Sequence, residues 1–150
     1  MAMRVALASD HAGFALKREL AVWLGELGYE VSDLGTNGTE SVDYPEFGAK
    51  LANSVATGAA QLGVAVCGSG IGISIAVNRN PKCRCARVDD PVSAALAREH
   101  NDANVLALGS RLIGPDMAKA CVSAFLGTDF AGGRHQRRVD MLSTLLQDSD

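Results

Sequence analysis

The sequence predicts an α/β fold of the doubly wound kind, in which a parallel sheet lies between layers of helices. Short apolar segments alternate along the chain with longer segments whose apolar residues recur at helical spacing. Most of the apolar segments end in glycine or polar side chains, as strands do where they turn into helices. The chain has 150 residues, of which 47% are hydrophobic and 21% charged, enough to bury the core of one domain. We therefore expect a single three-layer α/β/α domain over residues 1–150.

The first strand is expected at residues 5–8, an apolar run that stops at the polar turn 9–13. Asp10 and His11 would then lie at the carboxyl end of a strand, although Asp10 is equally well interpreted as a helix cap. The helix after this turn is expected to end at Gly28. Its apolar residues are expected to face the core, and they are Leu16, Leu20, Trp23, Leu24 and Leu27.

A second, shorter strand is expected at residues 31–35, followed by a polar loop at residues 36–41 that is long enough to reach over a site. Tyr44-Pro45 then starts a helix, because proline suits the first helical position. Asp43 and Tyr44 would lie just outside this helix, where Asp43 can serve as a cap. The inward residues of the helix are Phe47, Leu51 and Val55.

The rest of the chain is organised around residues 63–74, where an apolar strand ends in Cys67 and runs into Gly68, Gly70 and Gly72. This pattern predicts a buried parallel strand, a tight loop and a helix start whose backbone N–H groups form a cradle for an anion. The spacing fits neither the Walker loop nor the dinucleotide motif G-x-G-x-x-G, so a nucleotide is not the expected ligand. Cys67 could be only a small buried hydrophobe. Its place at a strand's carboxyl end, beside a helix N-terminus, favours a functional thiol.

The fourth and fifth strands are expected at residues 83–88 and 105–108. Between them, the acidic pair at residues 89–90 opens a helix over residues 91–100, where its charge suits the helix dipole and needs no catalytic role. The fifth strand places Arg111 at a strand's carboxyl end.

Two further helices complete the expected fold, one ending at Gly127 and one over about residues 135–147. The inward residues are Met117, Cys121 and Phe125 in the first of these helices and Val139, Leu142, Leu145 and Leu146 in the second. Arg134, Arg137 and Arg138 lie at the start of the last helix, where positive charge opposes the helix dipole. We therefore expect an anion to offset them.

Composition excludes several classes of partner. The formal net charge is −3 and no basic cluster is present, so neither nucleic acid nor an anionic membrane surface is expected. No apolar run is long enough to span a membrane, and the chain starts directly with a strand instead of a signal peptide, so we expect a cytoplasmic protein. The four cysteines contain no C-x-x-C pair, which favours reduced thiols over disulfides or a zinc site.

In a doubly wound fold the carboxyl ends of the strands meet at one edge of the sheet. The residues expected at this edge are Asp10, His11, Cys67, Ser69 and Arg111. A thiol, a glycine loop, imidazoles and arginines together suit a phosphorylated small molecule that undergoes proton transfer.

Six motifs spread over nearly the whole chain resemble the type B ribose-5-phosphate isomerase family. They are SDHAGF at 9–14, DYP at 43–45, CGSGIG at 67–72, HND at 100–102, GSR at 109–111 and GGRHQRRV at 132–139. This family also holds isomerases of allose 6-phosphate and galactose 6-phosphate. The resemblance implies a Rossmann-like, five-stranded parallel sheet and an enzyme of the pentose phosphate pathway. It also implies a homodimer with two active sites at the interface, which can pair into a tetramer, and no metal or organic cofactor.

The resemblance also assigns roles to individual residues. Cys67 matches the base that moves a proton between C1 and C2 of the open-chain sugar through an enediolate, and Ser69 stands where the family usually has threonine. His100 matches the residue that opens the furanose ring. Asp10 matches a ligand of a sugar hydroxyl. The residues that match the phosphate shell are His11, Arg111, Arg134 and Arg138, some of them supplied by the partner subunit. The other expected substrate contacts are Tyr44, Gly68, Gly70, Ile71, Gly72, Ser74 and Asn101.

Two questions stay open from the sequence. A five-carbon and a six-carbon sugar phosphate would use the same residues, and the difference between them would lie in cavity depth and in the loop that ends at Tyr44. A thiol-based redox sensor would need an exposed, reactive Cys67 with a resolving partner, and a ligand-binding module without catalysis would need only the glycine cradle. The absence of a second cysteine close in sequence to Cys67 argues against the redox alternative.

Overall fold

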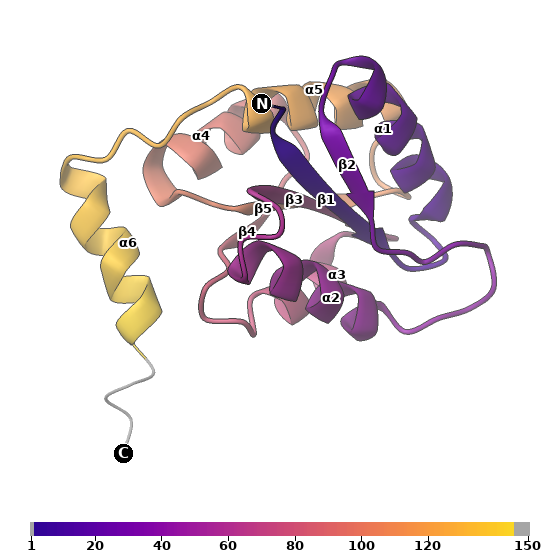
Figure 1. Ribbon diagram of the computed structural model, residues 1–150, viewed down its shortest axis with the longest axis horizontal. Helices are drawn as coiled ribbons and strands as arrows, with labels where there is room; N and C mark the ends of the chain where they lie inside the picture. Colours follow the sequence, from indigo (N-terminus) through magenta and orange to yellow (C-terminus); the bar gives the residue numbers. More distant parts are fainter. Residues whose placement is uncertain (1, 146–150) are drawn as a thin grey trace.

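In the computed structural model, which describes residues 2–145, five parallel strands form one sheet (Figure 1). The strands are β1 (Arg4–Ser9), β2 (Glu30–Asp33), β3 (Leu62–Cys67), β4 (Cys85–Arg87) and β5 (Val105–Gly109). Their order is β2-β1-β3-β5-β4, so the chain leaves the neighbouring strands β1 and β3 in opposite directions. Doubly wound folds bind ligands beyond the carboxyl ends of the strands at such a switch point. The predicted α/β/α fold with a five-stranded parallel sheet is confirmed.

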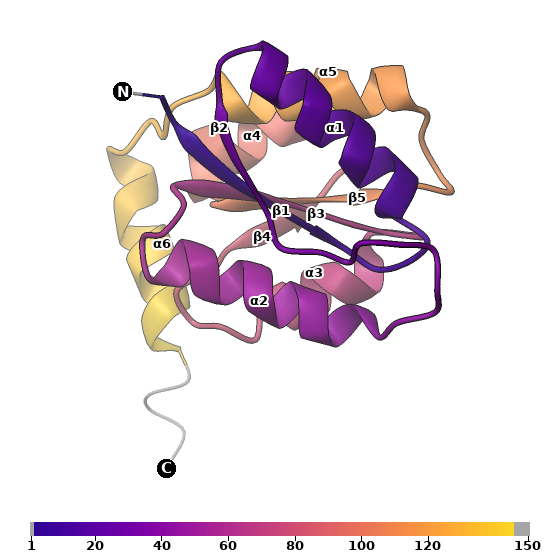
Figure 2. The ribbon, with the colours of Figure 1, turned by 45° about the vertical axis from the view of Figure 1, so that its right-hand side comes forward.

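Helices cover both faces of the sheet (Figure 2). The helices are α1 (Phe14–Glu26), α2 (Tyr44–Ala56), α3 (Ile71–Val77), α4 (Pro91–Asn101), α5 (Pro115–Leu126) and α6 (Arg134–Thr144). Helices α1, α4 and α5 lie over one face, and α2 and α3 lie over the other. No helix within residues 2–145 is long and apolar enough to cross a bilayer.

Successive side chains along each strand point to opposite faces of the sheet. The side chains on the two faces differ in size. The face under α1, α4 and α5 carries large residues such as Val64 and Leu106, whereas the face over α2 and α3 carries alanines such as Ala65 and Ala107. Strand β3 is buried along its whole length. The small side chains let α2 approach the sheet closely: a Cβ atom added to Gly63 would lie 2.9 Å from a methyl group of Leu51. This tight central packing fixes the end of β3, where Cys67 lies.

Helix α6 stands off the body of the domain, at the end of the sheet where the strands begin (Figure 2). Only one of its residues, Val139, is buried. Met141 and Leu142 are about half exposed, at 48% and 52%. Its start contacts the end of α4, where the rings of His100 and His135 stack with centroids 4.5 Å apart. The apolar face of α6 is therefore largely uncovered within one chain.

Several expected boundaries and buried positions differ from the structure. Strand β4 spans three residues instead of 83–88, because Cys83 donates its N–H to Asn80 in a turn and the N–H of Arg84 binds the Asn104 side chain. Tyr44 is the first residue of α2 and not outside it. The last helix starts one residue earlier than expected and ends at Thr144, and the expected residues 146 and 147 lie outside the described residues.

Four residues expected to face the core are exposed: Leu27, Met117, Leu142 and Leu145. Leu27 lies past the end of α1, and Met117 lies beside the buried face of α5, which begins at Ala118. Trp23 is only half buried and packs at the margin of the core.

Candidate active site

Cys67 ends β3 and is 4% exposed. Its Sγ accepts a hydrogen bond of 3.1 Å from the N–H of Gly70. Gly70 has a φ of 77°, and an added Cβ atom would lie 2.8 Å from the backbone of Leu108, so only glycine fits this turn. The sulfur is thus held in place by a hydrogen bond from the loop that follows it.

Ser69 lies in the same loop, and its Oγ accepts the N–H of Ile71 at 3.1 Å. Because that lone pair is occupied, the hydroxyl proton of Ser69 is directed elsewhere and is available to a substrate oxygen. Ser74 uses its own hydroxyl to donate to the carbonyl of Ile71 at 2.7 Å. The N–H groups of Gly70 and Ile71 therefore bind protein atoms and are not free donors of the expected anion cradle.

The turn after β1 holds Asp10 and His11 next to this loop. Asp10 is buried, and its Oδ1 accepts the N–H of Gly13 at 3.0 Å within the turn, while Oδ2 remains for another partner. Gly13 and not Asp10 is the N-cap of α1, so the interpretation of Asp10 as a helix cap is wrong. The Nδ1 of His11 accepts the N–H of Val42 at 3.1 Å. With its acceptor nitrogen occupied, a neutral His11 carries its proton on Nε2 and can donate from there.

Tyr44 and Arg111 lie on either side of the glycine loop. A Cβ atom added to Gly72 would lie 2.7 Å from the Tyr44 ring, and one added to Gly68 would lie 3.3 Å from Nη1 of Arg111. A hollow of about 550 Å³ borders Arg111 between the β1–α1 turn and the start of α5. The structure thus brings one set of predicted residues together at the carboxyl edge of the sheet. This set is Asp10, His11, Tyr44, Cys67, Gly68, Ser69, Gly70, Ile71, Gly72, Ser74 and Arg111.

The remaining predicted residues lie at the opposite edge. Helix α4 starts beyond the carboxyl end of β4 and runs back along the sheet to the point where β5 begins. Its 11 residues cover about 16 Å at 1.5 Å each. The residues at this amino edge are His100, Asn101, Arg134 and Arg138. One chain therefore carries two separate halves of the expected site.

A family model described as Ribose/Galactose Isomerase matches residues 5–142. The chain belongs to the ribose/galactose isomerase family. It is 45% identical over 144 residues to "Ribose-5-phosphate isomerase B" of Escherichia coli strain K12, covering 96% of this chain and 97% of that protein. It is also 36% identical over 145 residues to "Ribose-5-P isomerase B" of Listeria innocua, covering 97% of this chain and 98% of that one.

Two solved structures of this family superpose closely on the chain. The ribose-5-phosphate isomerase B of Clostridium thermocellum has a TM-score of 0.96 and 47% identity, covering 99% of this chain and 100% of that chain. The ribose-5-phosphate isomerase B of Mycoplasma genitalium, solved with bound ribulose-5-phosphate, has a TM-score of 0.94 and 36% identity, covering 99% of both chains.

Among the cysteines of this isomerase-family chain, three are held as thiols by burial. Burial raises the pKa of Cys121 to about 11, with the nearby carboxylates of Asp90 and Asp89 adding to the rise. Burial likewise raises the pKa of Cys83 and Cys85 above the ordinary value. Protonated thiols are poor bases and nucleophiles near neutral pH, so these three do not compete with Cys67 for the role of base.

The amino-edge half contains a histidine to which the sequence analysis assigned no role, His135. Its ring lies nearly parallel to that of His100, with an interplanar angle of 16°. Desolvation, followed by the positive charges of His100, Arg134 and Arg138, lowers the pKa of His135 below its ordinary value. The alternation of strands and helices does not indicate this pairing, because it depends on where α6 meets α4.

Arg87 is a second residue without a role in the sequence analysis. It ends β4, and its Nε donates to the carbonyl oxygen of Ser69 at 2.9 Å. The sequence did carry a signal for Arg87, because it lies near the carboxyl end of the strand expected at residues 83–88. Arg111 was identified as a site residue from its place at the carboxyl end of a strand.

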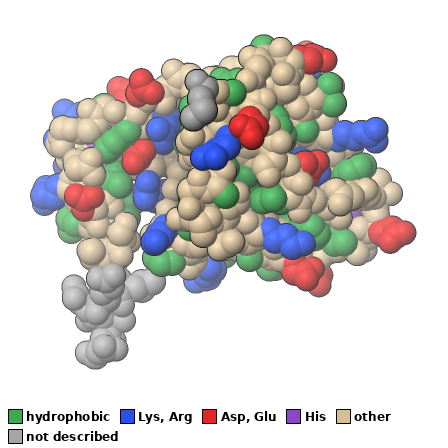
Figure 3. Space-filling model, viewed as in Figure 1, with side chains coloured by type: hydrophobic (Ala, Val, Ile, Leu, Met, Phe, Trp, Pro, Cys, Tyr) green, Lys and Arg blue, Asp and Glu red, His purple; other side chains and the backbone are tan. Residues whose placement is uncertain are grey.

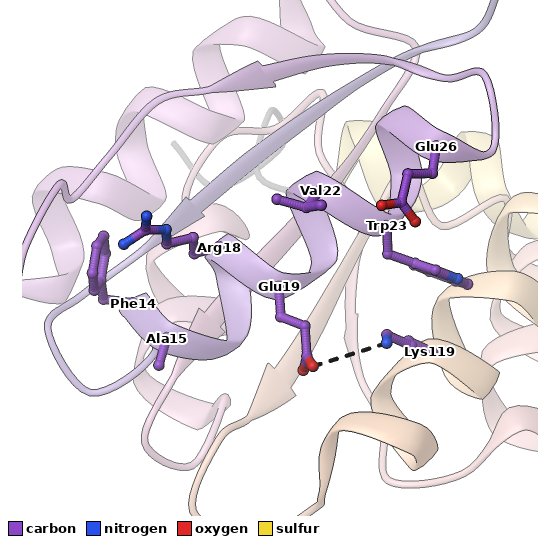
Figure 4. Close-up of a pocket in the computed structure, with 8 residues that line it drawn as sticks. All are labelled: Phe14, Ala15, Arg18, Glu19, Val22, Trp23, Glu26 and Lys119. Carbon is purple, nitrogen blue, oxygen red and sulfur yellow. Dashed lines mark ion pairs between the residues drawn. The ribbon is translucent and has the colours of Figure 1, made fainter.

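Another hollow of the described residues lies outside the two halves of the expected site. A groove of about 510 Å³ lies between α1 and α5 on the outer face and is bordered by Trp23 and by the Glu19–Lys119 ion pair of 3.9 Å (Figure 4). It shares Ala15 and Glu19 with the hollow beside Arg111. Figure 3 shows acidic and basic side chains interspersed on the face it displays, without a continuous basic stripe.

Proposed function

We propose that the chain is an aldose–ketose isomerase that interconverts ribose 5-phosphate and ribulose 5-phosphate. The observation that carries this proposal is the Cys67 sulfur at the end of β3, held by the Gly70 N–H beside the Ser69 hydroxyl. The family relatives named ribose-5-phosphate isomerase B, one of them solved with bound ribulose-5-phosphate, support the same substrate.

The carboxyl-edge half supplies the proton-transfer chemistry. The Cys67 thiolate removes the proton from C2 of the open-chain aldose and returns it to C1 of the enediolate. The hydroxyl proton passes from O2 to O1 in the same sequence, which completes the conversion of the aldose into the ketose. The Ser69 hydroxyl donates to the oxygen on which negative charge develops, a type of contact that is typically worth on the order of 10²- to 10³-fold in rate. Asp10 accepts a hydrogen bond from a sugar hydroxyl through Oδ2. His11 donates from Nε2, and Arg111 adds positive charge beside the loop, so both suit the phosphate group.

The amino-edge half supplies the remaining groups from a second copy of the chain. His100 opens the furanose ring, Asn101 contacts the sugar, and Arg134 and Arg138 bind the phosphate. Because one chain holds the two halves at opposite edges of its sheet, a homodimer is the smallest assembly in which they can meet. The exposed apolar residues support an interface on α3, α4 and α6, and they are Ile71, Ile75, Val92, Leu96, Met141 and Leu142. Two such dimers can associate further into a tetramer.

We place this enzyme in the cytoplasm. All four cysteines are free in the structure, and a mechanism that needs a reduced Cys67 suits a reducing compartment.

Steady-state kinetics on ribose 5-phosphate and allose 6-phosphate, measured side by side, test the proposed function. We expect a higher kcat/KM with ribose 5-phosphate and a loss of roughly 10²- to 10⁴-fold in Cys67→Ala, the contribution of a positioned base. Cys85→Ala is the matched control, since this half-buried thiol lies at the start of β4, at the other end of the sheet from Cys67. Near-full activity of Cys67→Ala would remove Cys67 as the base, and a preference for allose 6-phosphate would assign a six-carbon substrate.

A further inference from the structure

Arg87 links the edge strand β4 to the catalytic loop. Its Nε donates to the carbonyl oxygen of Ser69 at 2.9 Å, and its Nη1 donates to Oδ2 of Asp89 at 2.7 Å. The Arg87 side chain is 25% exposed. Strand β5 lies between β4 and β3, and Gly109 at its end makes room for this contact: an added Cβ atom there would lie 2.6 Å from the Ser69 oxygen.

The carbonyl that Arg87 binds belongs to the same peptide unit as the N–H that holds the catalytic sulfur. The Ser69 C=O and the Gly70 N–H form one peptide group, and that N–H donates to Cys67 Sγ at 3.1 Å. Peptide groups are planar, so the oxygen and the hydrogen point in opposite directions along one fixed axis. Fixing the oxygen at Arg87 therefore aims the hydrogen at the sulfur.

This peptide group needs an external restraint because glycines surround it. Gly68 precedes Ser69, and Gly70 itself has a φ of 77°, a region that glycine enters and leaves with little steric cost. Without a partner on the Ser69 oxygen, the peptide can rotate and withdraw its N–H from the sulfur. The guanidinium also carries a positive charge, which polarises the peptide and strengthens the hydrogen bond at its other end.

We propose that Arg87 is a positioning residue that holds the Ser69–Gly70 peptide so that its N–H stabilises the thiolate of Cys67. This inference rests on the proposed function for the role of Cys67 as the base. Arg87 itself touches neither the sulfur nor the reacting carbons. The two directed N–H bonds to Ser69 and Asp89 explain why arginine suits this position better than lysine, whose ammonium group has no fixed planar geometry.

The test compares Arg87→Met, which keeps the length of the side chain without its charge, with Arg87→Lys. Arg4→Gln is the matched control, because Arg4 also donates to a backbone carbonyl, that of Gly58 at 3.2 Å, outside the site. For Arg87→Met we expect kcat to fall about tenfold, the lower end of the range for losing a hydrogen bond to a charged group, while KM changes less than about twofold. Arg87→Lys should recover part of kcat, and Arg4→Gln should behave as the wild type.

Alkylation of Cys67 by iodoacetamide at neutral pH, with Cys67→Ala as the background, gives a readout without substrate. We expect slower alkylation in Arg87→Met, because the thiolate loses the hydrogen bond from the Gly70 N–H. General loosening of the loop would instead expose the sulfur and speed alkylation. Unchanged or faster alkylation, or an unchanged kcat, overturns the inference. Because alkylation does not require turnover, an inactive wild type or a fully active Cys67→Ala would count against the proposed function alone.

Discussion

The division of the site between two edges of the sheet predicts complementation between inactive variants. Cys67→Ala damages only the carboxyl-edge half, and His100→Ala damages only the amino-edge half. In the homodimer that we propose, each variant alone should retain on the order of 1% activity or less, the cost of losing an acid–base group. A heterodimer of the two variants combines both defects in one site and leaves the other site intact. Random reassociation makes about half of the dimers heterodimers, so the mixture should recover about one quarter of wild-type activity.

The assay is the isomerase rate after the two variants have been unfolded and refolded together, compared with each variant refolded alone. Cys67→Ala mixed with Arg111→Ala is the matched control. Both of these residues belong to the carboxyl-edge half, so every site of their heterodimer carries a defect. A rate for the Cys67→Ala and His100→Ala mixture that equals the average of the two parents would refute the shared site, since it would mean that one chain brings Cys67 and His100 together.

Three further predictions concern single positions. Lys17 is fully buried and pairs with Asp33 at 2.6 Å, so Lys17→Met should lower the free energy of unfolding by about 1.5–3 kcal/mol in a denaturant titration. Gly72→Ala places a methyl group against the Tyr44 ring, at 2.7 Å before any relaxation, and should lower kcat/KM by roughly tenfold while the protein still folds. In an NMR titration His135 should take up its proton at a lower pH than an ordinary histidine, because its pKa is lowered. The unfolded chain then binds that proton first, so the free energy of unfolding should fall as the pH drops through the ordinary range of histidine.

Each of these three predictions has a control variant. Lys119→Met breaks an ion pair of 3.9 Å whose two side chains are 30% and 47% exposed, and it should cost less than about 1 kcal/mol. Gly25→Ala adds a methyl group with no atom within 4 Å and should leave kcat/KM unchanged. His100→Ala removes a positive neighbour, so the titration of His135 should move to higher pH. Equal effects in variant and control would contradict the corresponding assignment.

The carboxyl-edge half was predictable from the sequence because one topological rule governs it. Once apolar segments are recognised as parallel strands, the residues that follow them must meet at one edge, and Asp10, Cys67 and Arg111 are there. The alternative interpretation of Asp10 as a helix cap was wrong, because Gly13 is the N-cap of α1 and Asp10 Oδ1 instead accepts the Gly13 N–H within the turn.

The uncovered face of α6 and the short β4 were not predictable from apolar periodicity. The pattern of Leu142 and Leu145 indicates a face that must be covered, but it does not say whether the same chain covers it. Strand β4 is short because the Asn104 side chain accepts the N–H of Arg84 at 2.7 Å. Side-chain competition of this kind depends on two segments that are distant in the sequence.

The hydrogen bonds inside the glycine loop change what the loop can do for a substrate. The sequence predicts a set of free N–H donors, yet the N–H groups of Gly70 and Ile71 bind Cys67 Sγ and Ser69 Oγ. These two bonds hold the Cys67 sulfur and the Ser69 hydroxyl in place before any substrate arrives. Substrate binding therefore costs less conformational entropy. The cost is that fewer backbone donors remain for the enediolate oxygen. The Ser69 hydroxyl then gains weight as a donor to that oxygen, and serine keeps this donor without the methyl group of threonine.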